Sequence, residues 1–379
     1  MTAYGFLSTY PPTQCGLATF SAALLKHLTA PGTGNQAGVV RVVDRADGVP
    51  AELPAEVVAH LVNGSPNGTE VATAALNAFD AAVVQHEYGI YGGRDGEDVL
   101  RVLAGLTVPV IVVFHTVLTT PSPHQRQLLE RIADRAAAVV VMSRAAARRL
   151  TELYLVDAAK ISVIPHGARP SRRVPVAGPR PTILTWGLIG PGKGIEWAID
   201  AFAGLGTLPS NPRYLVAGQT HPKVLEREGE RYRSSLQARA ASLGVADDVH
   251  FDAGYRDTES LMALVRQADL VLLPYESTEQ ATSGVLIEAI AALRPVVATA
   301  FPHAEELLAA GAGLLVPHQD TPAMTDALRR VLTEPGLAAS MTAGAARIAP
   351  SLEWSAVAES YHELAESFIG ARSRTSIAA

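Results

Sequence analysis

Short apolar runs alternate with longer amphipathic stretches along most of the chain, the pattern of strand–helix units built around parallel sheets. In the first half, the stretches with helix periodicity are Leu17–Leu28, Val71–Ala78, Gln125–Arg135 and Arg144–Leu153. The apolar runs with strand character are Tyr4–Tyr10, Val39–Val43, Ala81–Gln85, Val108–Phe114, Ala138–Met142 and Ile161–Ile164. This half is therefore predicted to form a doubly wound α/β domain.

The same alternation of apolar runs and amphipathic stretches begins again after a proline-rich segment that is poor in apolar residues. The predicted strands are Ile183–Trp186, Tyr214–Ala217, Val249–Phe251, Leu270–Leu273, Val296–Thr299 and Gly313–Val316. The predicted helices are Glu196–Phe202, Tyr232–Leu243, Glu259–Gln267, Gly284–Leu293, Ala304–Ala310 and Thr321–Leu332. We expect two Rossmann-like domains, residues 1–167 and 182–352, joined by a linker at 168–181. Residues 353–379 are expected to form a C-terminal helix and tail, with a return to the first domain left open. Ligands of such sheets bind at the carboxyl ends of the strands, here in a cleft between the domains.

Composition limits the classes of partner. A chain of 379 residues with 48% hydrophobic content has enough apolar material for two cores. Its formal net charge of −6 gives no global field that would attract nucleic acid. The single cysteine, Cys15, excludes an internal disulfide framework and a clustered thiolate metal site. The N-terminal residues do not read as a signal peptide, and no apolar run approaches the ~20 residues that span a bilayer. We expect a cytoplasmic protein.

A glycine-rich loop follows the first predicted strand of the second half and runs through Gly187, Gly190, Gly192, Lys193 and Gly194 into a helix. Exposed backbone N–H groups at such a turn bind phosphate, and the lysine adds a mobile positive charge. A P-loop would require Ser or Thr after the lysine to bind magnesium, but Gly194 occupies that position. The spacing also fails the dinucleotide-binding pattern. The loop therefore predicts diphosphate binding without a metal ion, against the alternative of a tight turn with a solvated lysine.

The segment after the predicted strand Leu270–Leu273 opens a second candidate site. Thr282 or Ser283 is placed to cap a helix, and Gly284 lets a ligand approach the unpaired amides of the first turn, including that of Val285. Glu288 lies about one turn into this helix, where a carboxylate can accept hydrogen bonds from vicinal hydroxyls. The alternative for Glu288 is simple complementarity to the helix dipole.

The order of these motifs resembles the C-terminal half of the family-4 retaining glycosyltransferases of the GT-B fold, a glycogen-synthase-like and mannosyltransferase-like superfamily. The family carries two glutamates separated by seven residues; the second matches Glu288, whereas the first falls on Gln280, with Glu279 beside it. The family also has arginine after the first glycine of the loop, where this chain has Leu188. The resemblance implies that Gln280 and Glu279 meet the sugar and Glu288 the ribose. The implied contacts to the donor further include Gly190, Gly192, Lys193, Gly194, Tyr255, Arg256, Thr282, Ser283, Gly284 and Val285.

The resemblance extends over the first half. It implies that Gly16, at the start of the Leu17 helix, lies over the diphosphate, and that His115, at the end of a strand, supports the transferred sugar. A hydrogen-bonded core histidine is the alternative for His115. His86, Glu87 and Tyr88 end another strand and are interpreted as acceptor-side surface. A metal pair of His86 and Glu87 is disfavoured because adjacent residues on a strand point in opposite directions.

The sequence therefore predicts a glycosyltransferase that moves a hexosyl group from a nucleoside diphosphate sugar to a hydroxyl acceptor, with retention and without a metal cofactor. His115, Gln280, Glu279 and Lys193 are the predicted catalytic residues. The expected partners are the sugar nucleotide and a small-molecule or glycan acceptor. A nucleotide-sugar epimerase, a P-loop-like NTPase or kinase and a non-catalytic sugar-nucleotide sensor stay as alternatives.

Overall fold

The structure is a computed structural model that describes residues 1–45, 52, 54–170, 180–254 and 256–377. The chain divides into two compact units. Unit 1 combines Met1–Gly167 with Trp354–Ala379, and unit 2 is Ala168–Glu353. Both units are α/β domains with a parallel sheet, as the alternation of apolar runs and amphipathic stretches predicts.

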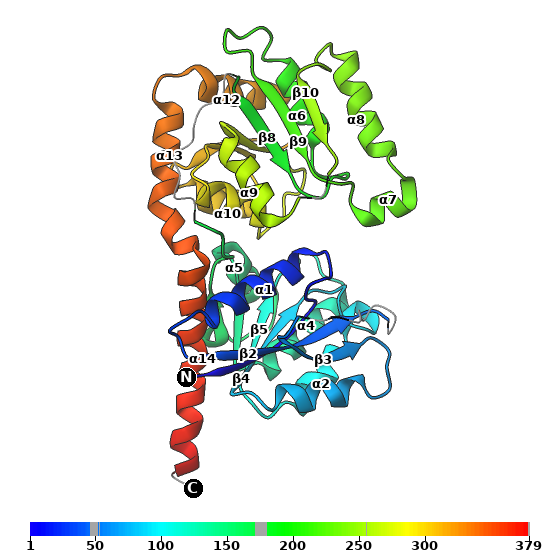
Figure 1. Cartoon of the computed structure of the whole chain (residues 1–379), viewed down its shortest axis with the longest axis vertical. Coiled ribbons are helices and arrows are strands. Elements are labelled where there is room, and N and C mark those ends of the chain that lie inside the picture. Colours follow the sequence, from blue (N-terminus) through cyan, green and yellow to red (C-terminus); the bar gives the residue numbers. More distant parts are fainter. Residues whose placement is uncertain (46–51, 53, 171–179, 255, 378–379) are drawn as a thin grey trace. The chain divides into compact units, whose positions relative to one another are not determined.

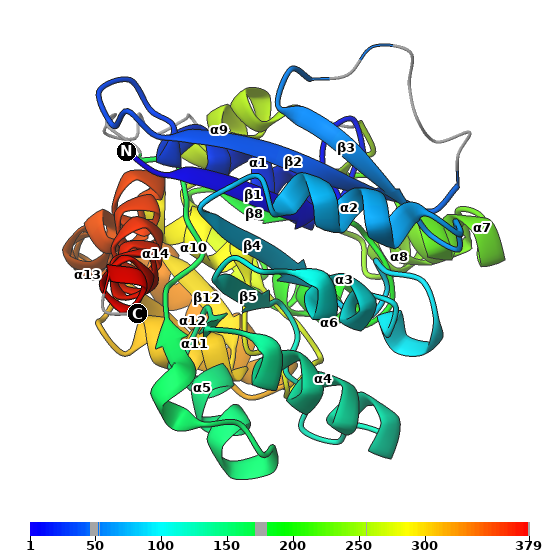
Figure 2. The same cartoon turned by 90° about the horizontal axis from the view of Figure 1, so that it is seen from below.

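Unit 1 is built on a seven-stranded sheet in the order β3-β2-β1-β4-β5-β6-β7, and each neighbouring pair is parallel. The strands β3, β2, β1, β4 and β5 can be followed in this order in Figure 2. Its strands are β1 (Ala3–Ser8), β2 (Gln36–Val43), β3 (Val57–Val62), β4 (Ala81–His86), β5 (Val110–Phe114), β6 (Ala138–Val141) and β7 (Ile161–Val163). Its helices are α1 (Gly16–Leu28), α2 (Gly68–Leu76), α3 (Val99–Gly105), α4 (Pro123–Arg135), α5 (Arg144–Leu153) and α14 (Trp354–Ile377).

Unit 2 is built on a six-stranded parallel sheet in the order β10-β9-β8-β11-β12-β13. Its strands are β8 (Thr182–Trp186), β9 (Arg213–Ala217), β10 (Val249–Asp252), β11 (Leu270–Leu273), β12 (Val296–Thr299) and β13 (Gly313–Val316). Its helices are α6 (Ile195–Ala203), α7 (Pro222–Glu228), α8 (Arg231–Ser242), α9 (Thr258–Gln267), α10 (Gly284–Ala291), α11 (Pro302–Leu308), α12 (Thr321–Thr333) and α13 (Leu337–Ile348). One apolar cluster lies on each face of this sheet, so the central strands are buried on both sides.

Strand order reverses once in each sheet, and this fixes where a ligand can bind. In unit 1 the chain moves outward from β1 in one direction and from β4 in the other, and in unit 2 the same reversal falls between β8 and β11. At such a switch point the loops leaving the two strands diverge and leave a crevice at the carboxyl edge. The loops after β1, β4, β8 and β11 are therefore the ones that the fold offers to a ligand.

The C-terminal helix α14 belongs to unit 1, where it lies against α1 (Figure 1). Its first residue, Trp354, is 6% exposed and its indole packs edge-on against Phe20 at a centroid distance of 5.1 Å. A methyl group on Gly167 would lie 2.2 Å from the same indole, so only glycine fits there. Farther along α14, the His362 imidazole and the Tyr4 hydroxyl are joined by a hydrogen bond of 2.6 Å. The chain thus closes the core of unit 1 with its last segment.

Most elements form where the sequence predicts them, and four were missed. The edge strand β3 was missed because Val58 is exposed and His60 interrupts its apolar pattern. The seven-residue helices α3 and α7 are too short to show a periodicity, and α13 is rich in alanine. The greater part of the predicted linker, 171–179, lies outside the described residues.

We expect Trp354→Ala to lower the free energy of unfolding of unit 1 by about 3–5 kcal/mol, because it removes a large buried side chain from the junction of α14 and α1. Urea unfolding followed by circular dichroism measures the change. Leu155→Ala, at a position 88% exposed, is the matched control and should change the stability by less than about 0.5 kcal/mol. Equal effects of the two substitutions would contradict the assignment of α14 to the core of unit 1.

Candidate functional site

The loops that follow β8 and β9 in unit 2 are joined by backbone hydrogen bonds. Gly187 N–H donates to the carbonyl of Ala217 at 3.0 Å, and Ile189 N–H donates to Gln219 at 2.9 Å. The carbonyl of Ile189 in turn accepts from His221 N–H at 2.8 Å. These bonds extend the sheet past its strand ends and hold the glycine-rich loop in one conformation.

Two glycines allow these backbones to approach more closely than any other residue would. A Cβ on Gly194 would lie 1.8 Å from the carbonyl oxygen of Pro274, and one on Gly218 would lie 1.9 Å from that of Gly187. Both residues also have positive φ angles, +66° and +135°, which L-residues with side chains rarely adopt. The structure thus explains Gly194, the helix-capping residue of α6, by packing against the end of β11.

The other predicted glycines of the loop differ in their surroundings. A Cβ on Gly190 would meet the Val224 side chain at 3.2 Å. Gly192 has a φ of +85°, and a Cβ there would meet no atom within 4 Å. Its carbonyl accepts from Glu276 N–H at 3.1 Å, which ties the loop to the segment after β11. Of the predicted positions Gly190, Gly192 and Gly194, Gly192 is the one whose α-carbon borders open space.

The Lys193 side chain is half-buried, with its ammonium 4.6 Å from the centroid of the Tyr275 ring. Burial lowers its pKa from the usual value. Within the described part of the chain, no carboxylate forms a salt bridge with this ammonium, so its nearest recorded partner is an aromatic face. A cation–π contact stabilises the charge only partly. The Lys193 ammonium is therefore able to meet an anionic ligand.

The backbone carbonyl of Tyr275 accepts hydrogen bonds from residues at two further strand ends. Its carbonyl accepts from the Thr299 hydroxyl at 2.7 Å and from Nδ1 of His318 at 2.8 Å. Next to it, Glu276 accepts from the Trp197 indole of α6 at 2.7 Å. The surface under Lys193 is therefore built jointly by the segments that follow β11 and β13 and by the last residue of β12.

Helix α10 begins at Gly284 with Ser283 as its cap, whose hydroxyl accepts from Leu286 N–H at 3.2 Å. Ser283 N–H donates to Nδ1 of His303 at 2.8 Å, and His303 is 1% exposed. The first-turn amides of Gly284 and Val285 have no intrahelical acceptor, as at every helix start. The start of α10 is thus fixed by the segments that follow β11 and β12.

Gln280 and Thr282 precede this cap and are partly buried, and the Gln280 amide donates to the Thr282 carbonyl at 3.1 Å. The backbone carbonyl of Gln280 accepts from His303 N–H at 3.3 Å. Glu279 is exposed to solvent. The structure therefore fixes Gln280 and leaves its neighbour Glu279 on the surface.

Glu288 lies one turn inside α10 and carries a perturbed carboxyl group. Burial raises its pKa to about 7, and a hydrogen bond from Trp186 and the positive charge of Arg169 act in the opposite direction. A carboxyl group with this pKa changes its protonation state near neutral pH. It can accept hydrogen bonds from a diol best when it is ionised.

Of the two residues predicted beside β10, the structure describes only Arg256. Arg256 is exposed and its Nε donates to Asp252 at 2.8 Å, an ion pair that lowers the pKa of Asp252. The predicted contact at Tyr255 lies outside the described residues. The Arg256 guanidinium is thus paired with the carboxylate of Asp252.

In unit 1 the loop after β1 leads into α1. Gly16 is the exposed first residue of α1, and a Cβ there would meet nothing within 4 Å. The Sγ atom of Cys15 caps the helix by accepting from Ala18 N–H at 3.4 Å. The guanidinium of Arg41, 4% exposed, donates to the Tyr10 carbonyl at 3.1 Å and to the Thr13 hydroxyl at 2.8 Å. A buried cation on β2 therefore holds the loop that presents Gly16.

His115 follows β5 directly and is half-buried, with its ring edge-on to Phe20 of α1 at 5.0 Å. Its Nε2 donates to the side-chain oxygen of Gln85 at 2.6 Å. Burial and the neighbouring imidazoles of His166 and His86 lower its pKa to about 3. His115 is thus a neutral imidazole at the carboxyl edge of the sheet.

The predicted acceptor-side residues do not act as one surface. His86 is completely buried between the rings of Tyr88 and Phe114, and its pKa is lowered to about 4 by burial. The expectation that His86 lies on the acceptor-side surface is therefore wrong, because its side chain points into the core. Glu87 and Tyr88 stay partly exposed, and Glu87 accepts from the Thr116 hydroxyl at 2.5 Å.

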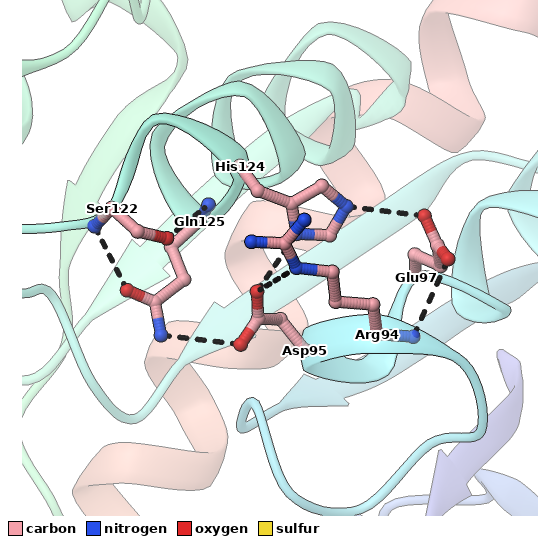
Figure 3. A network of polar contacts seen from close by, with 6 residues as sticks. All are labelled: Arg94, Asp95, Glu97, Ser122, His124 and Gln125. Carbon is pink, nitrogen blue, oxygen red and sulfur yellow. Dashed lines mark hydrogen bonds and ion pairs between the residues drawn. The ribbon is translucent and has the colours of Figure 1, made fainter.

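The loop that carries Glu87 and Tyr88 is anchored at its far end by the polar network of Figure 3. His124, at the start of α4, contacts Asp95 through Nδ1 at 2.7 Å and Glu97 through Nε2 at 3.2 Å. Gln125 donates to the other oxygen of Asp95 at 3.2 Å and completes a capping box with Ser122. This network fixes the loop between β4 and α3 to the first turn of α4 (Figure 3).

The described residues contain no cluster of three or more His, Cys, Asp or Glu side chains arranged to hold a metal ion. No helix in the described ranges is long and apolar enough to cross a membrane.

Sequence reasoning missed three residues that shape these edges. His303 holds the start of α10, Gln85 holds His115, and Arg233 of α8 donates to the Gly218 carbonyl at 2.7 Å. His303 and Gln85 lie at or just after strand ends, so the rule that selected His115 could have found them. Arg233 lies in a helix and gave no signal in the sequence.

Comparison with known proteins follows the division into two halves. Residues 16–172 match the family model described as Glycosyltransferase Family 4. Residues 180–334 match the model described as Glycosyl transferases group 1. Each model falls on one half of the chain and includes loops described above.

Relatives and solved structures agree with these matches. The chain is 29% identical to D-inositol 3-phosphate glycosyltransferase of Actinosynnema mirum, over 88% of this chain and 93% of that protein. It is 34% identical to the lipopolysaccharide glucosyltransferase WaaG of Escherichia coli, over 38% of this chain and 34% of that protein. A glycosyltransferase of Rickettsia africae superposes with a TM-score of 0.77 at 16% identity, over 97% and 99% of the two chains. Alr3699/HepE of Anabaena, solved with UDP, superposes with a TM-score of 0.76 at 17% identity, over 97% and 100%. The chain belongs to the family-4 glycosyltransferases of the GT-B fold.

Proposed function

We propose that this glycosyltransferase moves a hexosyl group from a nucleoside diphosphate sugar to a hydroxyl acceptor, with retention of configuration and without a divalent metal ion. The observation that carries the proposal is the Lys193 ammonium without a carboxylate partner among the described residues, next to the open backbone at Gly192. This pair lies at the switch point of unit 2, where ligands of such sheets bind.

In this proposal the diphosphate is held by the Lys193 ammonium and by the free amides of Gly284 and Val285 at the start of α10. A helix start and an ammonium stabilise phosphate charge without a metal ion. Glu288 accepts hydrogen bonds from the ribose hydroxyls, and Gln280 contacts the sugar.

The reaction breaks the bond between the sugar C1 and the diphosphate oxygen and forms a bond between C1 and the acceptor oxygen on the same face. The acceptor proton passes to an oxygen of the departing diphosphate, so no side chain is required as the base. Lys193 and the helix amides stabilise the negative charge that develops on the leaving group, which lowers the barrier. His115, held neutral by burial, contributes a hydrogen bond to a substrate hydroxyl.

The nature of the substrates is supported by the similar proteins. The Anabaena protein was solved with UDP, with UDP and glucose, and with UDP-glucose. The relative from Actinosynnema mirum is named D-inositol 3-phosphate glycosyltransferase. We therefore take nucleoside diphosphate hexoses as donors and small-molecule or glycan hydroxyls as acceptors.

The test is a panel of UDP- and GDP-hexoses incubated with polyols, their phosphates and oligosaccharides, in parallel with magnesium and with EDTA. We expect one donor class to give a glycosylated acceptor whose anomeric proton couplings match those of the donor, at the same rate in EDTA. An altered donor without product would indicate an epimerase, inversion would exclude the retaining mechanism, and loss of activity in EDTA would exclude metal independence.

Lys193→Ala and Glu288→Ala should each weaken binding of the sugar nucleotide by roughly 10- to 100-fold, because each removes a charged hydrogen-bonding partner. Isothermal titration calorimetry measures the affinity, and circular dichroism checks the fold. Lys26→Ala and Glu226→Ala change exposed residues of the same types and should leave the affinity unchanged. Wild-type affinity in both site variants would count against this donor site.

Donor binding should also depend on pH through Glu288. Its pKa of about 7 in the free protein means that the carboxyl group is mainly protonated at pH 6 and mainly ionised at pH 8. If the ribose diol binds the ionised form, affinity rises about tenfold across this range. Titrations with a sugar nucleotide, whose diphosphate diester has no ionisation in the range, measure the slope. Glu288→Gln should flatten it; a slope that persists in this variant would assign the pH dependence to another group.

A further inference from the structure

Gln85 is a buried polar residue that the proposed reaction does not use. It lies on β4 and its side chain is completely buried, on the side of the sheet that α1 covers. Its side-chain oxygen accepts from Nε2 of His115 at 2.6 Å, and its own carbonyl accepts from the Tyr91 hydroxyl at 2.6 Å. Among the residues that the structure describes, none forms a hydrogen bond with the side-chain nitrogen of Gln85. Burying a glutamine whose side-chain NH2 group is unpaired lowers the stability of the fold, so we ask what its hydrogen bond to His115 contributes to function.

The contact decides which ring nitrogen of His115 carries the proton. A neutral imidazole has one N–H, and the side-chain oxygen of Gln85 can only accept a hydrogen bond. With the Gln85 amide oriented as it is in the structure, the proton therefore lies on Nε2 and the lone pair on Nδ1. Among the described residues no hydrogen-bond partner is found for Nδ1, so this is the nitrogen that is left for a ligand.

The surroundings of His115 keep its imidazole ring uncharged. The ring packs edge-on against Phe20 of α1. The imidazoles of His86 on β4 and His166 beyond β7 help burial to lower its pKa, and burial lowers the pKa of both of these imidazoles as well. The carboxylate of Glu87 is engaged by the neighbouring Thr116 hydroxyl and the Tyr88 amide. No carboxylate forms a recorded ion pair with the His115 ring within the described residues, so a neutral amide is its direct partner.

We propose that Gln85 is a positioning residue that fixes the Nε2-protonated tautomer of His115, so that Nδ1 accepts a hydrogen bond from a hydroxyl of the substrate. The role of His115 toward substrate rests on the proposed function, whereas the tautomer itself does not. A glutamine suits the task because, unlike glutamate, it places no charge beside the ring that would favour the imidazolium ion.

Two substitutions separate this role from a structural one. Gln85→Met keeps the volume but removes the acceptor, so Nδ1 is no longer kept free of the proton; kcat should fall roughly tenfold at every pH, with the KM for the donor little changed. Gln85→Glu keeps an acceptor beside Nε2 and should retain near-wild-type kcat at pH 8.5. Gln127→Met and Gln127→Glu, at an exposed glutamine of the same unit, are the matched controls.

The pH profile of Gln85→Glu is the decisive readout. When the introduced carboxylate and the His115 ring together take up a proton, either the ring becomes an imidazolium ion or the new acid donates to Nε2 and the ring proton moves to Nδ1. Both forms remove the lone pair from Nδ1, so kcat should fall on acidification. The midpoint should lie roughly one to three pH units above that of the wild type. A merely structural glutamine would give a uniform loss without a new ionisation.

Nitrogen NMR of protein with ¹⁵N-labelled histidine tests the tautomer without reference to activity, using His115→Asn to assign the signal. We expect the proton on Nε2 in the wild type and a changed signal in Gln85→Met. A proton on Nδ1 in the wild type would overturn the proposal, even if the variants failed to fold. An active wild type with unchanged kcat in Gln85→Met and no shifted ionisation in Gln85→Glu would also overturn it. Absence of glycosyl transfer by the wild type would instead count against the proposed function.

Discussion

Contact between the backbones of neighbouring loops is the constraint on which the edge of unit 2 depends. The loop after β8 lies so close to the segments after β9 and β11 that alanine at Gly218 or Gly194 would collide with a carbonyl oxygen. This explains why the loop departs from the P-loop pattern. A serine or threonine at position 194 would place its Cβ 1.8 Å from the Pro274 oxygen, so the hydroxyl that binds magnesium elsewhere has no room here. Packing, and not only the ligand, selects the residues of this loop.

The two units handle ionisable groups differently at their carboxyl edges. In unit 1 the histidines His86, His115 and His166 are all held neutral by burial, and a glutamine partners the one nearest the edge. In unit 2 burial acts on groups of both signs, because it lowers the pKa of Lys193 and raises that of Glu288 toward neutrality. Both shifts reflect the partial loss of hydration of the charged form, which a ligand of opposite charge or a hydroxyl donor can replace.

The sequence predicts the fold well and the site in part. Apolar runs such as Leu270–Leu273 and Val296–Thr299 appear at the same bounds in the structure, since strands buried on both faces leave a strong signal. The strand β3 is only partly buried, so its apolar pattern in the sequence is weak. In the site, the motif positions Ser283 and Glu288 could be found from spacing, whereas Arg233 and Arg41 act through contacts that only the fold creates. His86 misled the prediction because a strand end does not reveal which face of the sheet a side chain takes.

The return of the chain to unit 1 has a consequence for synthesis on the ribosome. Unit 2 is an insertion within unit 1, since Trp354 and the rest of α14 come after all of its strands. Nascent chains usually fold domain by domain from the N-terminus. Here the surface of α1 that receives Trp354 stays uncovered until α14 leaves the exit tunnel. The inserted domain can complete its core first, so the order of maturation is the reverse of the order of translation.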